Sequence, residues 1–352
     1  MQVFVTHRIR CVISLLSVWL AVPIVQAAES IAVYVETLTV PPSTQPLLFV
    51  TVQNRQDIVY NGSIAVKGPE GWRLAPANRP ITLAPAESKR VPFTIEQGRN
   101  VEANTYAFEV TATGEGAPVL QRQETFVASA PYHPVTIDGN AEEWGDAIPV
   151  AFTTKGQKTV ISTYWNRRKF AILVAVQEQQ LVPYPGPAGA GPFEAVQVAL
   201  APLATSGDTP RPQQAGRFEF LLVAAGDAAR CFALAATDTP LSDIERPRAL
   251  EALALPDAEV AVRHLAGVTY WECALPFRLL RDEIRPSEGA EFFLSVLIHD
   301  PDGTGLRDLA QAAGLEPSAR DRQTWIRWPG AKWGDSPPLS YPIRWGLCTS
   351  KY

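Results

Sequence analysis

The sequence predicts an exported all-β protein built from two consecutive β-sandwich modules that follow a signal peptide. Three observations carry this prediction. Apolar and polar residues alternate in short bursts bounded by turn residues, and no stretch shows the helical period of 3.6. The chain contains 31 prolines and 23 glycines dispersed along its length, as is typical of turn-rich β proteins. Its first thirty residues have the form of a secretory signal.

The signal peptide is expected to occupy residues 1–27. Residues 7–10 contain one His and two Arg, and residues 11–25 form an almost unbroken apolar run. The small residues at positions 25–28 (Val-Gln-Ala-Ala) form a cleavage pattern. A retained membrane anchor is the alternative, but the run is short for a span. We therefore expect a periplasmic or extracellular protein without a membrane span after processing.

The charge balance argues against nucleic acid as a partner. The chain has 31 Lys and Arg against 36 Asp and Glu, so loss of Arg8 and Arg10 with the signal takes its net charge from −5 to −7. Nucleic acid attracts clustered Lys and Arg instead.

The first module is expected over residues 28–128. Apolar residues alternate with polar ones at residues 48–52, 91–95 and 106–112, which predicts three strands. The Asn-Gly pair at residues 61–62 is typical of a tight turn between strands. Several short strands at this spacing indicate an antiparallel sandwich of about 100 residues.

Residues 129–134 (Ser-Ala-Pro-Tyr-His-Pro) are expected to form a linker between the modules. Their two prolines restrict the backbone and limit regular pairing. Each module is then expected to hold its own core.

The second module is expected over residues 135–352. Phe170, Ile172, Val174 and Val176 alternate cleanly, which predicts a strand with one buried face. The other strand-like runs are residues 160–165, 195–200, 218–223, 260–262, 268–275 and 292–298.

Residues 31–127 resemble the immunoglobulin-like accessory modules found beside carbohydrate-active domains in bacterial secreted proteins. The resemblance is carried by residues 68–72 (Gly-Pro-Glu-Gly-Trp), by residues 81–88 (Ile-Thr-Leu-Ala-Pro-Ala-Glu-Ser), and by the alternating strands that follow. It implies an immunoglobulin-like sandwich and says little about a ligand.

The second module resembles the family 9 carbohydrate-binding modules along residues 135–347. The matching segments occur in the family's order, at residues 138–144, 165–176, 194–198, 270–277 and 289–335. The resemblance implies a jelly-roll sandwich that binds a polysaccharide or oligosaccharide without catalysis. It also implies bound structural calcium.

The same resemblance places a sugar between two aromatic walls, because flat aromatic faces pack against the C–H surface of a pyranose. Trp333 matches one wall; Phe193 stands where the family has the other, followed by Glu194. Packing inside the protein is the alternative for Trp333. The family's polar positions fall on Glu219, Leu297 and Gly330, which differ from the usual amide and basic partners.

Candidate calcium ligands come from residues 300–305 (Asp-Pro-Asp-Gly-Thr-Gly), which place oxygen side chains at alternate positions before a glycine. Gln311 stands at the twelfth place, so the loop is not an EF-hand. An Asp-Gly surface turn is the alternative. Asp300 and Asp302 are therefore candidate ligands. Asp138 and Glu178, which ends a strand-like run, are also hard oxygen ligands and join them as candidates.

Three cysteines follow the signal peptide, which leaves an odd thiol. Cys231 and Cys273 lie in strand-like stretches, and a disulfide between them would stabilise the fold by roughly 4 kcal/mol. Two buried free thiols are an equal alternative. Cys348 is the third.

Catalytic and cofactor motifs are absent from the sequence: it contains no Gly-x-Ser-x-Gly, His-Glu-x-x-His, Cys-x-x-Cys or Gly-x-Gly-x-x-Gly. Met1 is its one methionine, which disfavours a haem site with a Met ligand. We therefore expect a non-enzyme without haem or nucleotide that binds a glycan. The alternative is a structural protein that contacts other cell-envelope proteins and keeps a degenerate sugar site. A glycan-processing enzyme or a haem-binding sandwich is less favoured.

Overall fold

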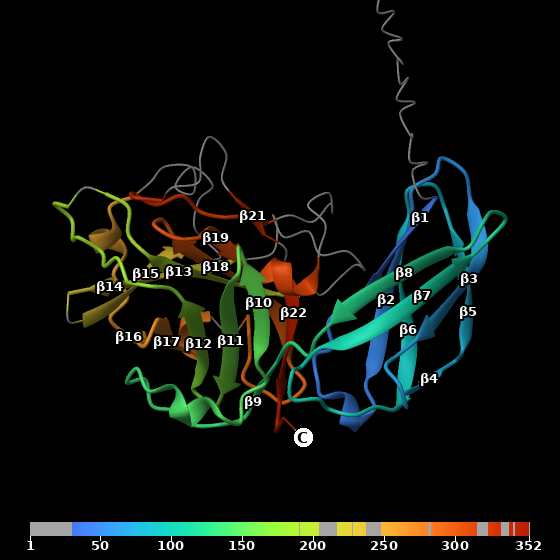
Figure 1. The fold of residues 1–352 in the computed structure, drawn as a ribbon, viewed down its shortest axis with the longest axis horizontal. Helices are drawn as coiled ribbons and strands as arrows, with labels where there is room; N and C mark the ends of the chain where they lie inside the picture. Colours follow the sequence, from blue (N-terminus) through green and yellow to red (C-terminus); the bar gives the residue numbers. More distant parts are fainter. Residues whose placement is uncertain are drawn as a thin grey trace, which may run out of the picture.

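The computed structural model describes residues 30–189, 191–203, 217–226, 228–236, 248–280, 283–314, 323–331, 338–340 and 342–351. In these ranges the chain is built of β-strands with short 3₁₀ turns, arranged as two sandwiches side by side (Figure 1). The prediction of an all-β fold is confirmed. No helix in the described part of the chain is long and apolar enough to cross a membrane.

The first sandwich consists of two four-stranded antiparallel sheets. One sheet has the order β1 (Ile31–Val35), β2 (Leu47–Asn54), β6 (Ser88–Gln97), β4 (Arg73–Ala75), with η1 (Pro42–Thr44) after β1. The other has the order β5 (Asn78–Leu83), β3 (Tyr60–Lys67), β7 (Tyr106–Thr113), β8 (Val119–Thr125). Alternate residues of β2 and β6 pack against β7, as their period of two predicts, and they form one core with Phe108 and Val110.

The Asn-Gly pair at residues 61–62 lies inside β3, so the expected tight turn is wrong. The chain turns before this pair, between the end of β2 at Asn54 and the start of β3 at Tyr60. A Cβ at Gly62 would lie 2.3 Å from the backbone oxygen of Thr113 on the neighbouring strand β7 and 2.6 Å from the Tyr60 hydroxyl. Glycine is required here because the backbone of β7 approaches closely, and not because the chain turns.

The second sandwich consists of a five-stranded and a seven-stranded sheet. The five-stranded sheet has the order β10 (Val150–Thr154), β11 (Gln157–Trp165), β12 (Lys169–Gln177), β17 (Val268–Pro276), β16 (Glu259–Leu265). The seven-stranded sheet runs β15 (Ala228–Ala235), β14 (Phe218–Ala225), β13 (Ala195–Pro202), β18 (Glu291–Asp300), β22 (Ile343–Cys348), β9 (Ser129–Pro131), and β19 (Gly305–Asp308) pairs with β18. The remaining elements are η2 (Ala141–Trp144), η3 (Leu250–Leu253), η4 (Phe277–Leu280), η5 (Leu309–Ala313), β20 (Gln323–Thr324) and β21 (Leu339–Ser340).

Strand β12 is covered on both faces, although its alternation predicts one buried face. Phe170, Ile172, Val174 and Val176 enter the core between the two sheets, as expected. Leu173 points outward but is buried as well, because residues 135–147 run across that face.

A buried carboxylate holds this covering segment in place. Glu272 of β17 accepts hydrogen bonds from Trp144 Nε1 at 2.8 Å, Gly139 N at 2.7 Å and Asp138 N at 3.0 Å. The Asp-Gly and Glu-Trp pairs that open the second module therefore serve packing, because they close the outer face of the five-stranded sheet.

Ser129–Pro131 form strand β9, whereas a linker with little regular pairing was expected. This strand pairs in parallel with β22, and Ser129 lies opposite Gly346. Pro131 is tolerated because it ends an edge strand, where its missing N–H is not needed. The chain then crosses to the other sheet, where His133 N donates to Trp165 O at 2.9 Å.

The two sandwiches share buried contacts. Ile148 and Cys348, from the second module, pack in the core cluster of the first. Asn104 Nδ2 donates to Pro149 O at 2.9 Å, and Thr39 Oγ1 donates to Glu291 Oε1 at 2.6 Å. The first core is therefore completed by side chains from beyond residue 134.

Candidate functional site

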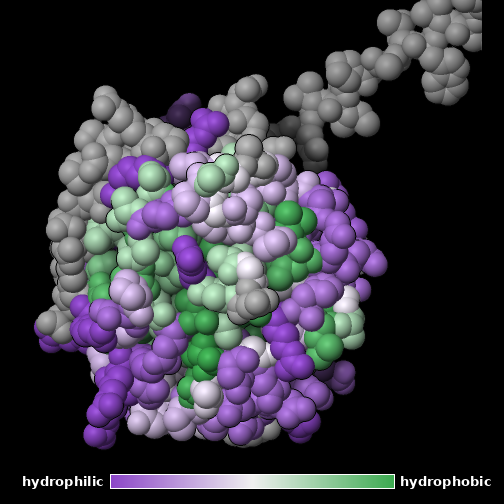
Figure 2. Space-filling view, turned by 90° about the vertical axis from the view of Figure 1, so that its left-hand side faces the viewer, coloured by the Kyte–Doolittle hydropathy of each residue, from purple (hydrophilic) through white to green (hydrophobic). Residues whose placement is uncertain are grey.

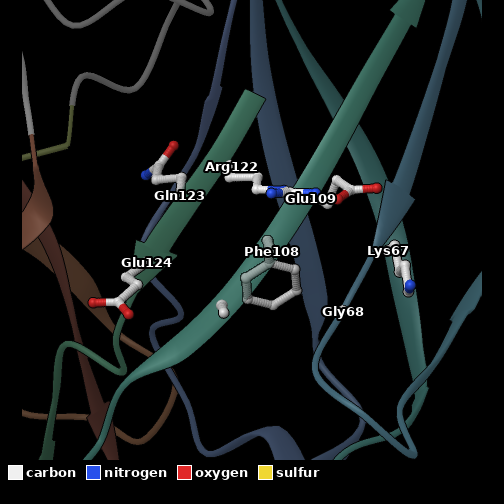
Figure 3. A pocket seen from close by; sticks show the side chains of 8 residues that line it. Lys67, Gly68, Phe108, Glu109, Arg122, Gln123 and Glu124 are labelled. Carbon is white, nitrogen blue, oxygen red and sulfur yellow. Dashed lines mark hydrogen bonds and ion pairs between the residues drawn. The ribbon is translucent and has the colours of Figure 1, made fainter. Parts of the chain in front are cut away.

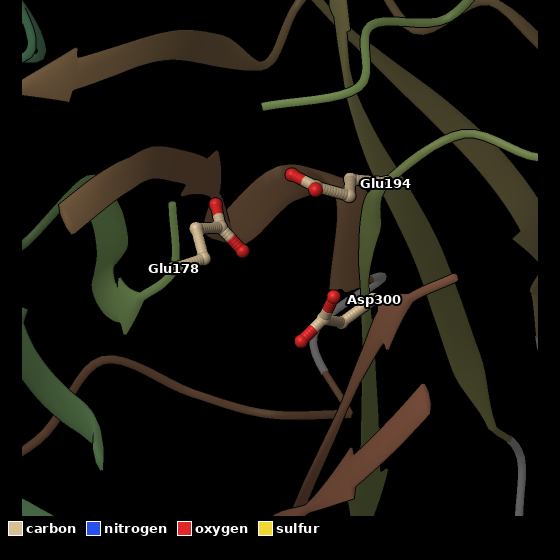
Figure 4. A group of neighbouring side chains, drawn as sticks. All are labelled: Glu178, Glu194 and Asp300. Atoms are coloured by element: carbon tan, nitrogen blue, oxygen red, sulfur yellow. The ribbon is translucent and has the colours of Figure 1, made fainter. Parts of the chain in front are cut away.

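Three buried carboxylates meet at one end of the second sandwich. Glu178 follows β12, Glu194 precedes β13, and Asp300 ends β18. One oxygen of each lies within 4.8 Å of the others, and the residues are 8%, 1% and 1% exposed. Figure 4 shows the three side chains converging on one space.

Strand register explains this meeting. Strands β13 and β18 are antiparallel neighbours, with Ala195 opposite His299, so the residue before β13 lies beside the last residue of β18. Glu178 arrives from the other sheet, where its N–H donates to Gly267 O at 3.0 Å.

The two glutamates lack the partners that buried carboxyl groups need. Glu178 Oε1 and both oxygens of Glu194 have no donor from the surrounding protein. The contact between these two carboxyl groups contributes to the pKa shift of each. Burial raises the pKa of Glu178 to about 7. Burial and then the neighbouring Glu178 raise the pKa of Glu194 to about 10. Unpartnered buried oxygens call for a compensating ligand, and a cation bound between the two glutamates and Asp300 would supply one.

Asp300 is held in a different state. Its Oδ2 accepts from Thr304 N at 2.8 Å, Thr304 Oγ1 at 2.6 Å and the Arg307 guanidinium at 2.6 Å. Burial alone raises the pKa of Asp300, but these donors outweigh it and the net pKa is lowered. Asp300 is therefore ionised at neutral pH.

The donor set fits a hard divalent cation such as calcium, which takes oxygen ligands. Acid–base chemistry on a substrate fits less well, because all three carboxyl groups are buried. Asp302 is at the rim, where its Oδ2 accepts from Gln180 Nε2 at 2.9 Å and its charge further raises the pKa of Glu194.

The structure changes the expected set of ligands in two places. Asp138 lies apart from this group: its Oδ1 accepts from Asn140 N at 2.9 Å, in the segment held by Glu272. Glu194, expected beside a sugar, joins Glu178 and Asp300 instead. The one feature of the sequence that could have indicated Glu194 as a cation ligand is its place as an acidic residue directly before an apolar strand.

Phe193 does not form the open aromatic wall that was expected, because it is 3% exposed. Its ring packs 4.9 Å from the rings of both Tyr184 and Trp328, measured between centroids. Trp333, the other expected wall, lies outside the described residues.

The outer face of the seven-stranded sheet is covered by the chain itself. Ile326 N donates to Glu219 Oε1 at 2.8 Å. Gln197 of β13 donates to Ile326 O and accepts from Trp328 Nε1, both at 3.0 Å. His299 hydrogen-bonds to the same Gln197, and burial lowers its pKa to about 3, so the imidazole is neutral. Polar groups that a ligand would use on this face are occupied by residues 326 and 328.

The other two positions at which family 9 carbohydrate-binding modules have polar residues, Leu297 and Gly330, offer no polar side chain to a ligand. Leu297 is buried in the same aromatic cluster. A Cβ at Gly330 would lie 2.8 Å from the Phe193 ring, so this glycine allows the covering segment to approach closely.

Cys231 of β15 and Cys273 of β17 are buried free thiols, so the disulfide alternative is not what the structure holds. They face each other across the core, and a hydrogen bond between the two thiols, together with burial, raises the pKa of Cys273. Cys348 is also a free buried thiol.

Neither of two surface features has the open aromatic face of a sugar site. A shallow hollow on the first module is lined by Lys67, Glu109 and Arg122, and Arg122 pairs with Glu109 at 3.0 Å (Figure 3). Phe108 beneath it is buried, so no aromatic face is offered. On the end of the second module shown in Figure 2, apolar residues surface as separate areas divided by polar ones.

Comparison with known proteins adds one family match. Residues 40–114 match the family described as the NPCBM-associated, NEW3 domain of alpha-galactosidase. No curated protein matches the chain.

Three solved structures show distant likeness. A family 9 carbohydrate-binding module from Caldicellulosiruptor kristjanssonii in complex with glucose is 10% identical, with TM-score 0.31, covering 51% of this chain and 82% of that one. The YadV chaperone is 9% identical, with TM-score 0.23, covering 79% and 97%. The E. coli chaperone DraB is 11% identical, with TM-score 0.22, covering 59% and 93%. These TM-scores are too low to support an argument from any of the three.

Proposed function

We propose that this chain is an exported, non-catalytic glycan-binding protein whose second module is stabilised by a bound calcium ion. The observation that carries the glycan proposal is the match of residues 40–114 to a domain that accompanies a glycosidase. The ordered resemblance of residues 135–347 to family 9 carbohydrate-binding modules supports it. The unpartnered oxygens of Glu178 and Glu194, beside Asp300, support the calcium proposal.

Trp333 remains the proposed aromatic contact for the glycan, without Phe193 as its partner. The segment that contains Trp333, residues 289–335, is one of those in which the chain resembles the family 9 carbohydrate-binding modules.

Replacing Trp333 by Ala is expected to weaken glycan binding roughly 5- to 150-fold, the equivalent of about 1–3 kcal/mol for one aromatic anchor. The midpoint of thermal unfolding should change little if the ring meets the ligand. A glycan array on the mature protein would identify the ligand, and titration calorimetry would then compare the variants.

Phe193→Leu is the matched control for that experiment. Because Phe193 is packed, this change should lower the unfolding midpoint and leave glycan affinity within about twofold. Loss of stability without loss of affinity in Trp333→Ala would assign Trp333 to packing.

A structural role in a cell-envelope assembly is the second candidate. It is favoured by the closed sheet face, where Ile326 and Trp328 take the hydrogen bonds of Gln197 and Glu219. A wild-type protein that is folded but binds no glycan on the array would support this candidate over the first.

A further inference from the structure

Arg307 is a fully buried guanidinium directly beside the three carboxylates. It belongs to β19, and its side chain has no exposed surface. Besides Asp300, it donates to Gln177 O at 2.9 Å and to Thr304 Oγ1 at 2.7 Å. Longer contacts of 3.4 Å reach Lys158 O and Thr159 Oγ1. Arg307 therefore ties β18 to both β11 and β12 of the opposite sheet.

Arg307 also fixes how Asp300 faces the site. The guanidinium and both Thr304 donors engage Oδ2 of Asp300, and Oδ1 receives none of these three bonds. A Cβ at Gly303 would lie 2.5 Å from Oδ1, so the glycine keeps the space beside that atom open. One oxygen of Asp300 is thus engaged by the protein, and the other is the one left to a cation.

The charges at this end of the sandwich match a divalent ion. The three buried carboxylates and the one buried guanidinium have a net charge of minus two when all are ionised. Asp302 at the rim is exposed, so solvent and salt screen its charge. A divalent cation would neutralise this buried group. Without Arg307 the three carboxylates would have a net charge of minus three, which a trivalent cation would neutralise. Buried charges interact strongly because the surroundings screen them little.

We propose that Arg307 is a positioning and specificity-determining residue of the cation site. It orients Asp300 and sets the net charge so that the site favours divalent over trivalent ions. This inference rests on the proposed calcium site, which is supported by the unpartnered oxygens of Glu194, a residue 1% exposed.

The test compares the affinities of the full mature protein, freed of metal, for calcium and for terbium. Calorimetry measures calcium binding, and tryptophan-sensitised luminescence measures terbium binding. In Arg307→Met, the ratio of calcium affinity to terbium affinity should fall about tenfold or more, because the net charge becomes minus three. In Arg307→Lys, which keeps the charge, the ratio should stay within about threefold of wild type.

A double variant guards against misfolding of Arg307→Met, which leaves a buried carboxylate uncompensated. Asp300→Asn combined with Arg307→Met restores a net charge of minus two and removes both halves of the buried pair. Its affinity for both ions should fall, and its ratio should return to the wild-type value.

The possible outcomes separate this inference from the proposed function. A wild-type protein that binds neither ion would overturn the cation site and with it the role of Arg307. Binding with an unchanged ratio in Arg307→Met, or in the double variant a ratio far from wild type, would leave the calcium site standing and overturn the role of Arg307. A purely structural arginine would lower the unfolding midpoint in each variant without moving the ratio.

Discussion

Adding calcium to the metal-free protein is expected to raise its unfolding midpoint by about 5–10 °C at pH 8 and by much less at pH 5. At a calcium concentration of about 100 times its Kd, binding stabilises the folded state by about 2.7 kcal/mol. Each kcal/mol corresponds to about 2–4 °C for a module of this size. Thermal unfolding followed by tryptophan fluorescence, with calcium or with a chelator, measures the shift.

The pH dependence follows from the pKa values of the two glutamates. In the metal-free fold these are about 7 for Glu178 and about 10 for Glu194, both above the ordinary 4.5. Between pH 4.5 and these values the folded state holds more protons than the unfolded state, so stability falls as pH rises. Calcium takes the place of these protons, and its stabilising effect therefore grows through the same range.

Glu194→Gln provides the control for the calcium experiment. It removes one ligand charge and the glutamate of the pair with the larger pKa shift, so the calcium response should nearly disappear and the pH dependence should flatten above pH 7. A calcium response equal to that of the wild type in this variant would place the ion elsewhere.

Glu272→Ala is expected to lower the free energy of unfolding by about 3–5 kcal/mol. The change leaves the buried donors Trp144 Nε1 and Gly139 N without an acceptor, and each unsatisfied group costs about 1–3 kcal/mol. It also releases the segment that covers Leu173. Urea unfolding measures the loss, and the emission of Trp144 should shift to longer wavelength as the ring becomes hydrated.

Glu142→Ala is the matched control, because Glu142 lies two residues from Trp144 and is exposed. Surface changes of this kind stay within about 0.5 kcal/mol. A cost for Glu272→Ala no larger than this would show that the covering segment is held by its apolar contacts alone.

The sequence predicted the fold where burial repeats with a period of two. The alternation in β2, β6, β7 and β12 is local, so it could be recognised without knowing any partner strand. β9 could not be recognised in this way, because its pairing depends on β22, more than 200 residues further along the chain. The Asn-Gly pair misled for the same reason: the close approach of the Thr113 backbone oxygen to Gly62 comes from the pairing of β3 with β7.

The candidate site was only partly predictable. Glu178 and Asp300 were recognisable as oxygen ligands at strand ends, but their meeting with Glu194 depends on the register of β13 and β18 and on the opposite sheet. The burial of Phe193 depends on residues 325–328, far away in sequence. The local sequence, an aromatic residue after Gly-Pro, is the same whether that residue is exposed to solvent or buried beneath another segment, so it could not predict the burial of Phe193.

The parallel pairing of β9 with β22 has a consequence for the order of assembly. β22 is the last of the described strands to be synthesised, yet its Cys348 fills part of the first core and its Gly346 lies against Thr39. The N-terminal half therefore waits, with its interior incomplete, until the last strands have emerged. Contacts this distant in sequence slow folding. Both halves thus mature together in one late step, and in the meantime the nascent chain offers exposed apolar surface to chaperones and proteases.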